Sequence, residues 1–383
     1  MAKKKTEPKA VHPAADPNVM GLRGVVVAQP ITRTLDENYM PYAMSVIVSR
    51  AIPEIDGFKL SHRQRLYTMY KMGLLTGNRT KSANIVGQTM RLNPHGDAAI
   101  YETMVRLAKG NESLLHPFVD SKGNFGKVYS RDMAYAASRY TEAKLAPICA
   151  ELFRDLDCDA VDFVDNYDNT TKEPALLPTT YPNVLASANQ GIAVGIASQI
   201  CGFNLGEVCD TTIGLLKNPD HVIASTLLAP DFSTGGQILC EPEEPRSIYE
   251  TGRGGVKVRA KYRYLKSENI IEIYEIPYST SLEAILDKVS ELMKAGKIKE
   301  ISDMRDETDL SGLKLAVDLK RGADPDKLMQ KLFRLTPLQD TVSCNFNILI
   351  AGMPRVLGVR ELLEEWLAWR TECVRRRVYF NLH

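Results

Sequence analysis

Apolar residues at helical spacing predict most of the structure in the first 160 residues. A helix is expected from Thr34, which begins a capping-box pattern with Glu37, through Val48. Residues 59–110 predict three short helices separated by tight breaks, and Asp97 is the expected N-cap of the third. Three short helices of this kind indicate a helix-turn-helix module.

The next segment is rich in turn residues. Gly123–Gly126 and the polar stretch after it would suit a wing following the helix-turn-helix module. A further helix with Leu145 and Leu156 on its apolar face is expected, and Pro147 should kink it or move its start. Before these elements, residues 1–20 lack periodicity and are expected to be disordered, and Val25–Val27 could form a short strand.

The pattern changes after about residue 170. Apolar and polar residues alternate over residues 256–264, 270–276 and 313–319, which predicts strands, and residues 282–292 predict an amphipathic helix between them. Interleaved strands and helices indicate a separate α/β domain. The last expected helix covers Val359–Arg377.

Composition indicates a soluble globular protein with two or three domains. The 383 residues are 44% hydrophobic and 25% charged, and no apolar run approaches the ~20 residues of a membrane helix. The basic N-terminus is not followed by the apolar stretch of a secretory signal, so a cytoplasmic location is expected. The seven cysteines contain no CxxC pair, which favours reduced, buried thiols over a zinc site.

The charges are unevenly distributed although the net charge is only +1. Residues 59–110 contain nine Lys and Arg against two acidic residues, whereas residues 151–174 contain eight acidic residues against two basic ones. A local basic face suits phosphate binding, but a solvated charged face would give the same pattern. Charge alone therefore leaves both interpretations open.

Few motifs in the sequence carry chemistry by themselves. There is no GxxxxGK[ST] phosphate loop and no GxSxG nucleophile motif. Asp155-x-Asp157-x-Asp159 lacks the Gly and Glu of a calcium loop, so a solvated helix end is the favoured interpretation. In Arg139-Tyr140 the guanidinium could favour the phenolate and stabilise charge on a phosphorus centre, although the pattern alone favours a partly buried structural tyrosine at a helix start.

Seven segments taken together are more specific than any of these motifs. They occur in order at residues 42–48, 56–59, 94–97, 123–126, 139–142, 161–168 and 191–195. As a set they resemble the A subunits of the type IIA topoisomerases DNA gyrase and topoisomerase IV, and the likeness covers nearly everything after residue 34.

The resemblance implies an α+β multidomain fold. A flexible arm at 1–33 would precede a winged-helix (CAP-like) breakage-reunion domain at 34–168 and an α/β tower at 169–352. Residues 353–383 would begin a coiled-coil helix, and the exit gate and C-terminal β-pinwheel of the family would be absent.

The resemblance also implies a site and an activity. Tyr140 would form the 5′-phosphotyrosyl bond to DNA beside Arg139, and Ile192 would wedge between base pairs. Ala98 and Glu102 match positions where quinolone drugs bind through a water–magnesium bridge. The residues matching basic positions near the scissile phosphate are Arg50, Lys59, His62, Arg63 and His95.

The family resemblance also implies a substrate and partner subunits for this chain. Double-stranded DNA would be the substrate, and two A subunits would join two B subunits in an A2B2 complex associated with the nucleoid. The B subunit would supply the Mg²⁺ site in its TOPRIM domain and would hydrolyse ATP, with no metal site in this chain and no role for a membrane. The alternatives are a non-catalytic winged-helix DNA-binding protein, a decoy that dimerises with a full-length subunit, or the A subunit of topoisomerase IV.

The sequence departs from the family pattern at several positions. Asn93 replaces the first histidine of His-Pro-His-Gly-Asp, and Gln64 replaces the second of two consecutive arginines. Ala98 stands where the family usually has serine. The stretch between Phe125 and Tyr140 is also longer than usual.

Overall fold

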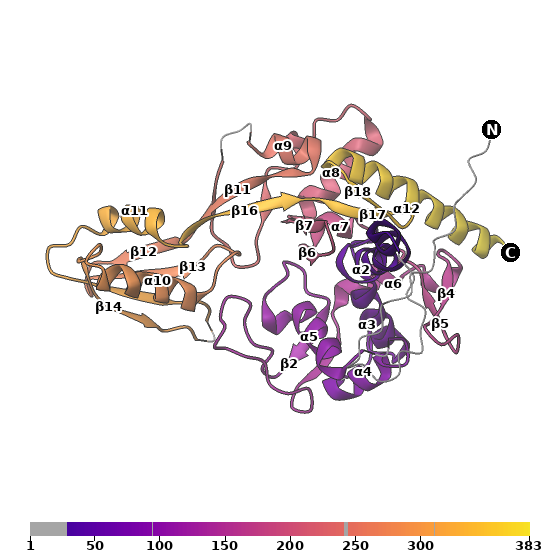
Figure 1. The fold of residues 1–383 in the computed structure, drawn as a ribbon, viewed down its shortest axis with the longest axis horizontal. Coiled ribbons are helices and arrows are strands. Elements are labelled where there is room, and N and C mark those ends of the chain that lie inside the picture. The colour runs from indigo at the N-terminus through magenta and orange to yellow at the C-terminus, as the bar shows by residue number, and fades with distance from the viewer. Residues whose placement is uncertain (1–28, 94, 241–243, 310) are drawn as a thin grey trace, which may run out of the picture.

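The computed structural model describes residues 29–93, 95–240, 244–309 and 311–383, and the expected mixture of α and β structure is confirmed. Figure 1 shows an elongated molecule with a four-stranded sheet at one end and the C-terminal helix at the other. The strand expected at Val25–Val27 lies outside the described residues.

The first helical segment covers residues 31–51 and is longer than expected. It consists of α1 (Ile31–Thr34), a π-helical turn, α2 (Met40–Val46) and a second π-helical turn at Ile47–Ala51. The predicted capping box is wrong, because Thr34 lies within the helix and Pro30 is at the N-cap. The two capping side chains have other partners: Thr34 accepts from Gln29, and Glu37 from Arg33.

The three short helices are confirmed, and a small sheet lies beside them. The helices are α3 (Leu60–Lys71), α4 (Ser82–Thr89) and α5 (Asp97–Leu107). The antiparallel sheet has the order β1 (Thr80–Lys81), β3 (Glu142–Leu145), β2 (Val119–Lys122). The predicted N-cap is wrong by one residue, since Gly96 occupies that position and Asp97 is the first helical residue.

The single helix expected over residues 145–156 is wrong, for the reason that Pro147 suggested. Leu145 ends β3, Pro147 begins a 3-10 turn, and the α-helix that follows is only α6 (Ala150–Phe153). Proline cannot donate a backbone hydrogen bond but is tolerated in a first helical turn. The hydrophobic core of this half of the chain extends past residue 168 to Ala186.

A five-stranded sheet forms the middle of the molecule. Its core receives side chains from α8 (Leu205–Lys217), α9 (Glu244–Thr251) and the C-terminal helix α12 (Val359–Leu382). The strand order is β10 (Gln237–Leu239), β11 (Arg253–Arg259), β16 (Gln339–Asn345), β7 (Ala197–Ile200), β6 (Asn189–Ile192). The helices nearby are α7 (Asn183–Ala186), α8 (Leu205–Lys217) and α9 (Glu244–Thr251).

A four-stranded antiparallel sheet and two helices form a separate core, which we call the distal domain. The strand order is β12 (Lys261–Leu265), β13 (Ile270–Glu275), β15 (Leu315–Leu319), β14 (Ile301–Asp306). The helices α10 (Leu282–Lys294) and α11 (Pro325–Leu335) bury their apolar sides in this core. The helix expected at 282–292 and the strands expected at 270–276 and 313–319 are confirmed. The single strand expected over 256–264 is wrong, because the chain breaks at Ala260 into β11 and β12, which belong to different sheets.

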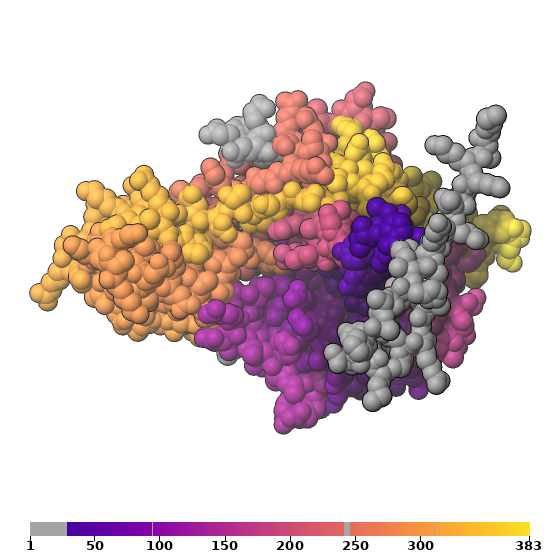
Figure 2. Space-filling view, viewed as in Figure 1, coloured from indigo at the N-terminus to yellow at the C-terminus, as the bar shows by residue number. Residues whose placement is uncertain are grey.

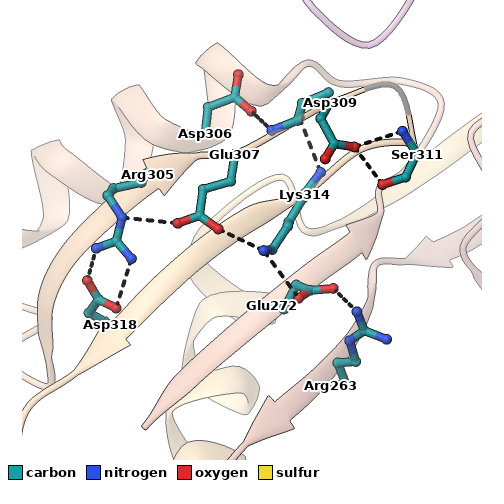
Figure 3. A network of polar contacts seen from close by, with 10 residues as sticks. Arg263, Glu272, Arg305, Asp306, Glu307, Asp309, Ser311, Lys314 and Asp318 are labelled. Carbon is teal, nitrogen blue, oxygen red and sulfur yellow. Dashed lines mark hydrogen bonds and ion pairs between the residues drawn. The ribbon is translucent and has the colours of Figure 1, made fainter. Parts of the chain in front are cut away.

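The distal domain also has a highly charged surface, shown in Figure 3. Glu272 on β13 pairs with Arg263 and Lys314. Arg305 pairs with Asp318 and Glu307, and Glu307 also pairs with Lys314. The exposed pairs of Arg305 and Glu307 contribute little individually and keep this surface polar. Glu272 is buried, so its charge is compensated by Arg263 and Lys314.

The C-terminal helix α12 (Val359–Leu382) runs from the middle of the molecule to the end opposite the distal domain, and acidic residues of the first half anchor it (Figure 1). Asp155 is buried and pairs with Arg370 at 2.7 Å and Arg377 at 3.2 Å. The interpretation of Asp155 as part of a solvated helix end is therefore wrong. The remaining strands pair in twos: β4 (Phe163–Asp165) with β5 (Lys172–Pro174), β8 (Gly202–Phe203) with β9 (Pro230–Asp231), and β17 (Asn347–Ile350) with β18 (Met353–Val356).

No helix within the described ranges is both long enough and apolar enough to cross a membrane.

Candidate active site

Tyr140 lies on the surface, in the loop that enters β3. Its side chain is 66% exposed, and the Arg139 guanidinium carbon lies 4.7 Å from the centre of its ring. A ring buried in the core would have excluded a role as a nucleophile. The observed position leaves the phenol accessible, with a cation against its face.

The backbone on both sides of Tyr140 is held by the start of α4. The amides of Ser82 and Ala83 donate to the carbonyls of Thr141 at 3.0 Å and Ser138 at 3.1 Å. These amides belong to the first turn of the helix, which has no intrahelical acceptors for them. The exposed phenol therefore stands on a fixed backbone.

Side chains beneath the loop add to this support. Thr141 is buried and donates through its hydroxyl to Ser82 at 2.8 Å. The Tyr101 hydroxyl lies 2.8 Å from the same Thr141 hydroxyl and donates to the carbonyl of Ala136 at 2.9 Å. Sequence reasoning missed Ser82 and Tyr101, because their role depends on contacts across 35 or more residues that no local pattern reveals.

Lys59 and His62 lie together beside a cavity of about 470 Å³ between α5, residues 126–135 and Tyr278. The pKa of Lys59 is lowered to about 8, mainly because the side chain is partly buried and to a smaller extent because the positive charge of Arg106 lies nearby. Burial and then Lys59 lower the pKa of His62 well below its usual range. Tyr135 lines this cavity, whereas Tyr140 is not among its lining residues.

Arg50, Lys59 and Ile192 are also brought together, around the hairpin formed by β6 and β7. Ile192 is 80% exposed, and the Lys59 ammonium donates to the backbone of Gln190 at 2.5 Å. A side chain at Gly191 would collide with the carbonyl oxygen of Ala51, so the hairpin packs directly against the helical turn that carries Arg50. Figure 2 shows the indigo surface of this helical segment next to the pink surface of the central part of the chain.

Arg63 does not fit the predicted phosphate contact. It is 2% exposed and forms a buried ion pair with Asp56, with Nε to Oδ2 at 2.8 Å and Nη2 to Oδ1 at 3.1 Å. Asp56 also accepts the backbone amides of Phe58 and Leu177. Arg63 therefore joins α3 to the chain around residue 56, and Asp56 in turn holds the backbone at Leu177.

His95, Ala98 and Glu102 are exposed along the start of α5. Glu102 pairs with Arg106 at 3.4 Å, one turn further along the helix. Within the described residues, no group of three or more His, Cys, Asp or Glu side chains is arranged to hold a metal ion.

A family model for the A subunits of DNA gyrase and topoisomerase IV matches residues 50–383. The chain belongs to this family. It is similar to the DNA gyrase A subunit of Halalkalibacterium halodurans, with 40% identity over 360 residues that cover 92% of this chain and 43% of that protein. It is likewise similar to the DNA gyrase A subunit of Granulibacter bethesdensis, with 41% identity over 99% of this chain and 40% of that protein.

A plant relative gives the same result. The chloroplastic/mitochondrial DNA gyrase A subunit of Arabidopsis thaliana is 39% identical over 95% of this chain and 39% of that protein. The chain thus spans about two fifths of the length of the curated relatives that it matches.

Two departures from the family pattern lie next to each other in the structure. The Asn93 amide donates to the Gln64 side-chain oxygen at 2.7 Å, and the Gln64 amide donates to Glu173 at 2.9 Å. All three side chains are buried. The altered positions therefore form one hydrogen-bonded chain that leads to the backbone amide of His95, which donates to Asn93 at 3.2 Å.

Proposed function

We propose that this chain carries out DNA cleavage and religation as part of a gyrase A subunit in a type II topoisomerase, an isomerase. The observation that carries the proposal is an exposed Tyr140 beside Arg139 on a backbone held by buried groups. Nucleophiles need both access and a fixed geometry. Family membership and relatives named as DNA gyrase A subunits support the same reaction.

In the proposed step, the Tyr140 oxygen attacks a backbone phosphorus. A bond forms between phosphorus and the phenolic oxygen, and the bond to the 3′ oxygen of the neighbouring sugar breaks. The phenol loses a proton and the leaving 3′ oxygen gains one. Arg139 stabilises the negative charge that develops, and religation is the reverse reaction, so the phosphodiester energy is retained.

The fold assignment belongs to the same proposal. Helices α3–α5 with the β1–β3–β2 sheet would be the winged-helix domain, residues 169–352 the tower, and α12 the start of the coiled coil. The α3–α5 arrangement, the two cores of the second half and the 24-residue length of α12 support these assignments.

DNA contacts are proposed for residues that are either exposed, as Arg50 and His95 are, or half-buried beside the cavity, as Lys59 and His62 are. Arg50, Lys59, His62 and His95 would bind backbone phosphates, and Ile192 would insert between base pairs. Ile192 suits this role because its apolar side chain lies at the end of a hairpin and is 80% exposed. An apolar side chain in that position is not buried in a hydrophobic core of the isolated chain. Arg63 is omitted because its charge is already paired inside the protein.

The remaining components would come from partners. The described residues do not form a carboxylate cluster for Mg²⁺, and the sequence has no phosphate loop for ATP. From the family resemblance we assign Mg²⁺ binding and ATP hydrolysis to a B subunit in an A2B2 assembly with two copies of this chain. A topoisomerase IV A subunit is the second candidate, because the matching family model includes both enzymes.

The test uses the chain with its cognate B subunit, Mg²⁺, ATP and supercoiled plasmid, stopped with denaturant and protease. Linear DNA blocked by peptide at both 5′ ends is the expected product. Tyr140→Phe should abolish it, while DNA affinity changes less than about twofold because only one hydroxyl is removed. Adducts that survive in Tyr140→Phe, or an absence of adducts in the unaltered complex, would contradict the proposal.

A further inference from the structure

The loop that leads to Tyr140 is anchored in the distal domain, far along the chain. Tyr129 is 4% exposed, and its ring belongs to the hydrophobic core formed by the four-stranded sheet with α10 and α11. The carbonyl of Tyr129 accepts the amide of Leu282, the first residue of α10, at 2.9 Å. Figure 1 shows a loop of the purple part of the chain reaching toward the orange distal domain.

Glu283 holds the next residues of the loop. Its Oε1 accepts from the Ser130 hydroxyl at 2.5 Å and from the amide of Asp132 at 3.1 Å, and its Oε2 accepts from the amide of Arg131 at 3.0 Å. Burial alone would raise the pKa of Glu283, but these hydrogen bonds outweigh it and lower the pKa to about 2. The carboxylate therefore stays charged at every physiological pH, and charge-assisted hydrogen bonds of this kind are the strong ones.

Hydrogen bonds at the other end of the loop connect these anchored residues to the segment that precedes Tyr140. Asn124 closes the loop, since its side-chain amide donates to the carbonyl of Ala134 at 3.0 Å and its backbone carbonyl accepts the amide of Ala136 at 2.9 Å. Gly126 has a φ of +66°, and a Cβ there would lie 2.7 Å from the carbonyl oxygen of Met133. Only three residues separate Ala136 from Tyr140.

We propose that Tyr129 and Glu283 form a clasp through which the distal domain positions Tyr140 for cleavage. Neither residue touches the phenol, so both are positioning residues and not catalytic ones. Tyr129 and the residues held by Glu283 lie between Phe125 and Tyr140, the stretch that is longer than the family pattern. This inference rests on the proposed role of Tyr140 and adds a second domain to the residues that determine its placement.

The chain itself provides matched variants for a test. Glu283→Gln retains the shape of the side chain but turns one acceptor into an amide that faces the loop's N–H groups. Asp287→Asn is the control, because Asp287 is 74% exposed and touches the same loop only through Arg131 at 3.4 Å. Tyr129→Ala removes the buried ring, whereas Tyr129→Phe removes only a hydroxyl that has no hydrogen-bond partner among the described protein atoms.

Two measurements are made on each variant, in the complex with the B subunit. Hydrogen exchange reports the protection of the Arg131 and Asp132 amides, and the plasmid assay reports covalent adducts beside DNA affinity. In Glu283→Gln we expect exchange at least about tenfold faster and adducts at least about tenfold fewer, at a DNA affinity within about twofold, because small misplacements of reacting groups are costly. Tyr129→Ala should behave in the same way, and Asp287→Asn and Tyr129→Phe should match the unaltered chain.

The outcomes separate the clasp from the proposed function. An unaltered complex that forms no adducts would defeat the proposed function, and the exchange data would then still report whether the clasp exists. Unprotected Arg131 and Asp132 amides in the unaltered chain would overturn the clasp, whatever the variants do. A Glu283→Gln variant with fast exchange but normal adduct levels would overturn its positioning role.

Discussion

Asn93 donates its side-chain amide to the side-chain oxygen of Gln64 at 2.7 Å, and both residues depart from the pattern of their family. The two changes lie 29 positions apart in sequence but form one buried contact. An amide is both donor and acceptor, so Gln64 can accept from Asn93 and donate to Glu173 at the same time.

This pair predicts a coupled effect on stability. Asn93→Leu should cost about 1–3 kcal/mol, because the buried oxygen of Gln64 loses its donor and the amide of His95 loses its acceptor. Gln64→Leu should cost a similar amount by leaving Asn93 and Glu173 unpaired. The double variant should be more stable than the sum of the two losses predicts. Chemical denaturation measures all three, and strictly additive losses would show that the contact is energetically unimportant.

Lys59 should make DNA binding depend on pH. The pKa of Lys59 is about 8 in the free chain and should rise when a phosphate anion binds beside its ammonium group. At pH values above about 8, Lys59 should therefore take up a proton when DNA binds. Affinity should therefore fall as the pH rises from 7 to 9. The dependence should weaken in Lys59→Met but not in Lys122→Met, whose ammonium is 72% exposed. Fluorescence anisotropy with a short duplex measures the affinities, and an unchanged pH profile in Lys59→Met would exclude the linkage.

Ala98 predicts weak trapping of cleaved DNA by quinolones. The family resemblance implies that a serine at this position and an acid four residues later would anchor a water–magnesium bridge to the drug. Here Glu102 is exposed, but Ala98 has no side-chain group that could hydrogen-bond the waters. Ala98→Ser should therefore increase the amount of drug-stabilised cleavage product in the complex with the B subunit. No increase over the unaltered chain would count against this prediction.

Asp155 should be essential for docking α12. Asp155→Ala would leave Arg370 and Arg377 without their buried partner, at a cost of about 3 kcal/mol. Asp159→Asn is the control, since Asp159 is 73% exposed and asparagine tolerates its φ of +51°. The melting temperature should be clearly lower in Asp155→Ala and unchanged in Asp159→Asn. Equal melting temperatures for Asp155→Ala and the unaltered chain would contradict the prediction.

Local patterns in the sequence predicted the regular elements better than the boundaries and contacts. The helices α3, α4, α5 and α10 and the strands β12, β13 and β15 follow from apolar spacing, because each element buries one face. The predicted capping box at Thr34 failed because nearby side chains offered Thr34 and Glu37 other partners. Asp97 missed the N-cap by one residue, which is the usual uncertainty at helix ends.

The candidate site was predictable only in part, since much of it depends on distant contacts. The Arg139-Tyr140 pair is adjacent in sequence and was found through a motif. Arg63 fitted a motif as well, but its pairing with Asp56 inside the protein could not be read from the basic character of the segment. The support from Ser82 and Tyr101, and the anchorage at Glu283, join residues 35 to 153 positions apart.

The absence of a side chain at Gly191 has a mechanical consequence. There is no room for even a methyl group between the β6–β7 hairpin and Ala51, so the backbones that carry Ile192 and Arg50 are in direct contact. In the proposed complex, Ile192 would insert between base pairs and Arg50 would bind a nearby backbone phosphate. Because the two segments are packed backbone to backbone, we expect them to move together. Insertion of Ile192 into the duplex and phosphate binding by Arg50 would then be coupled.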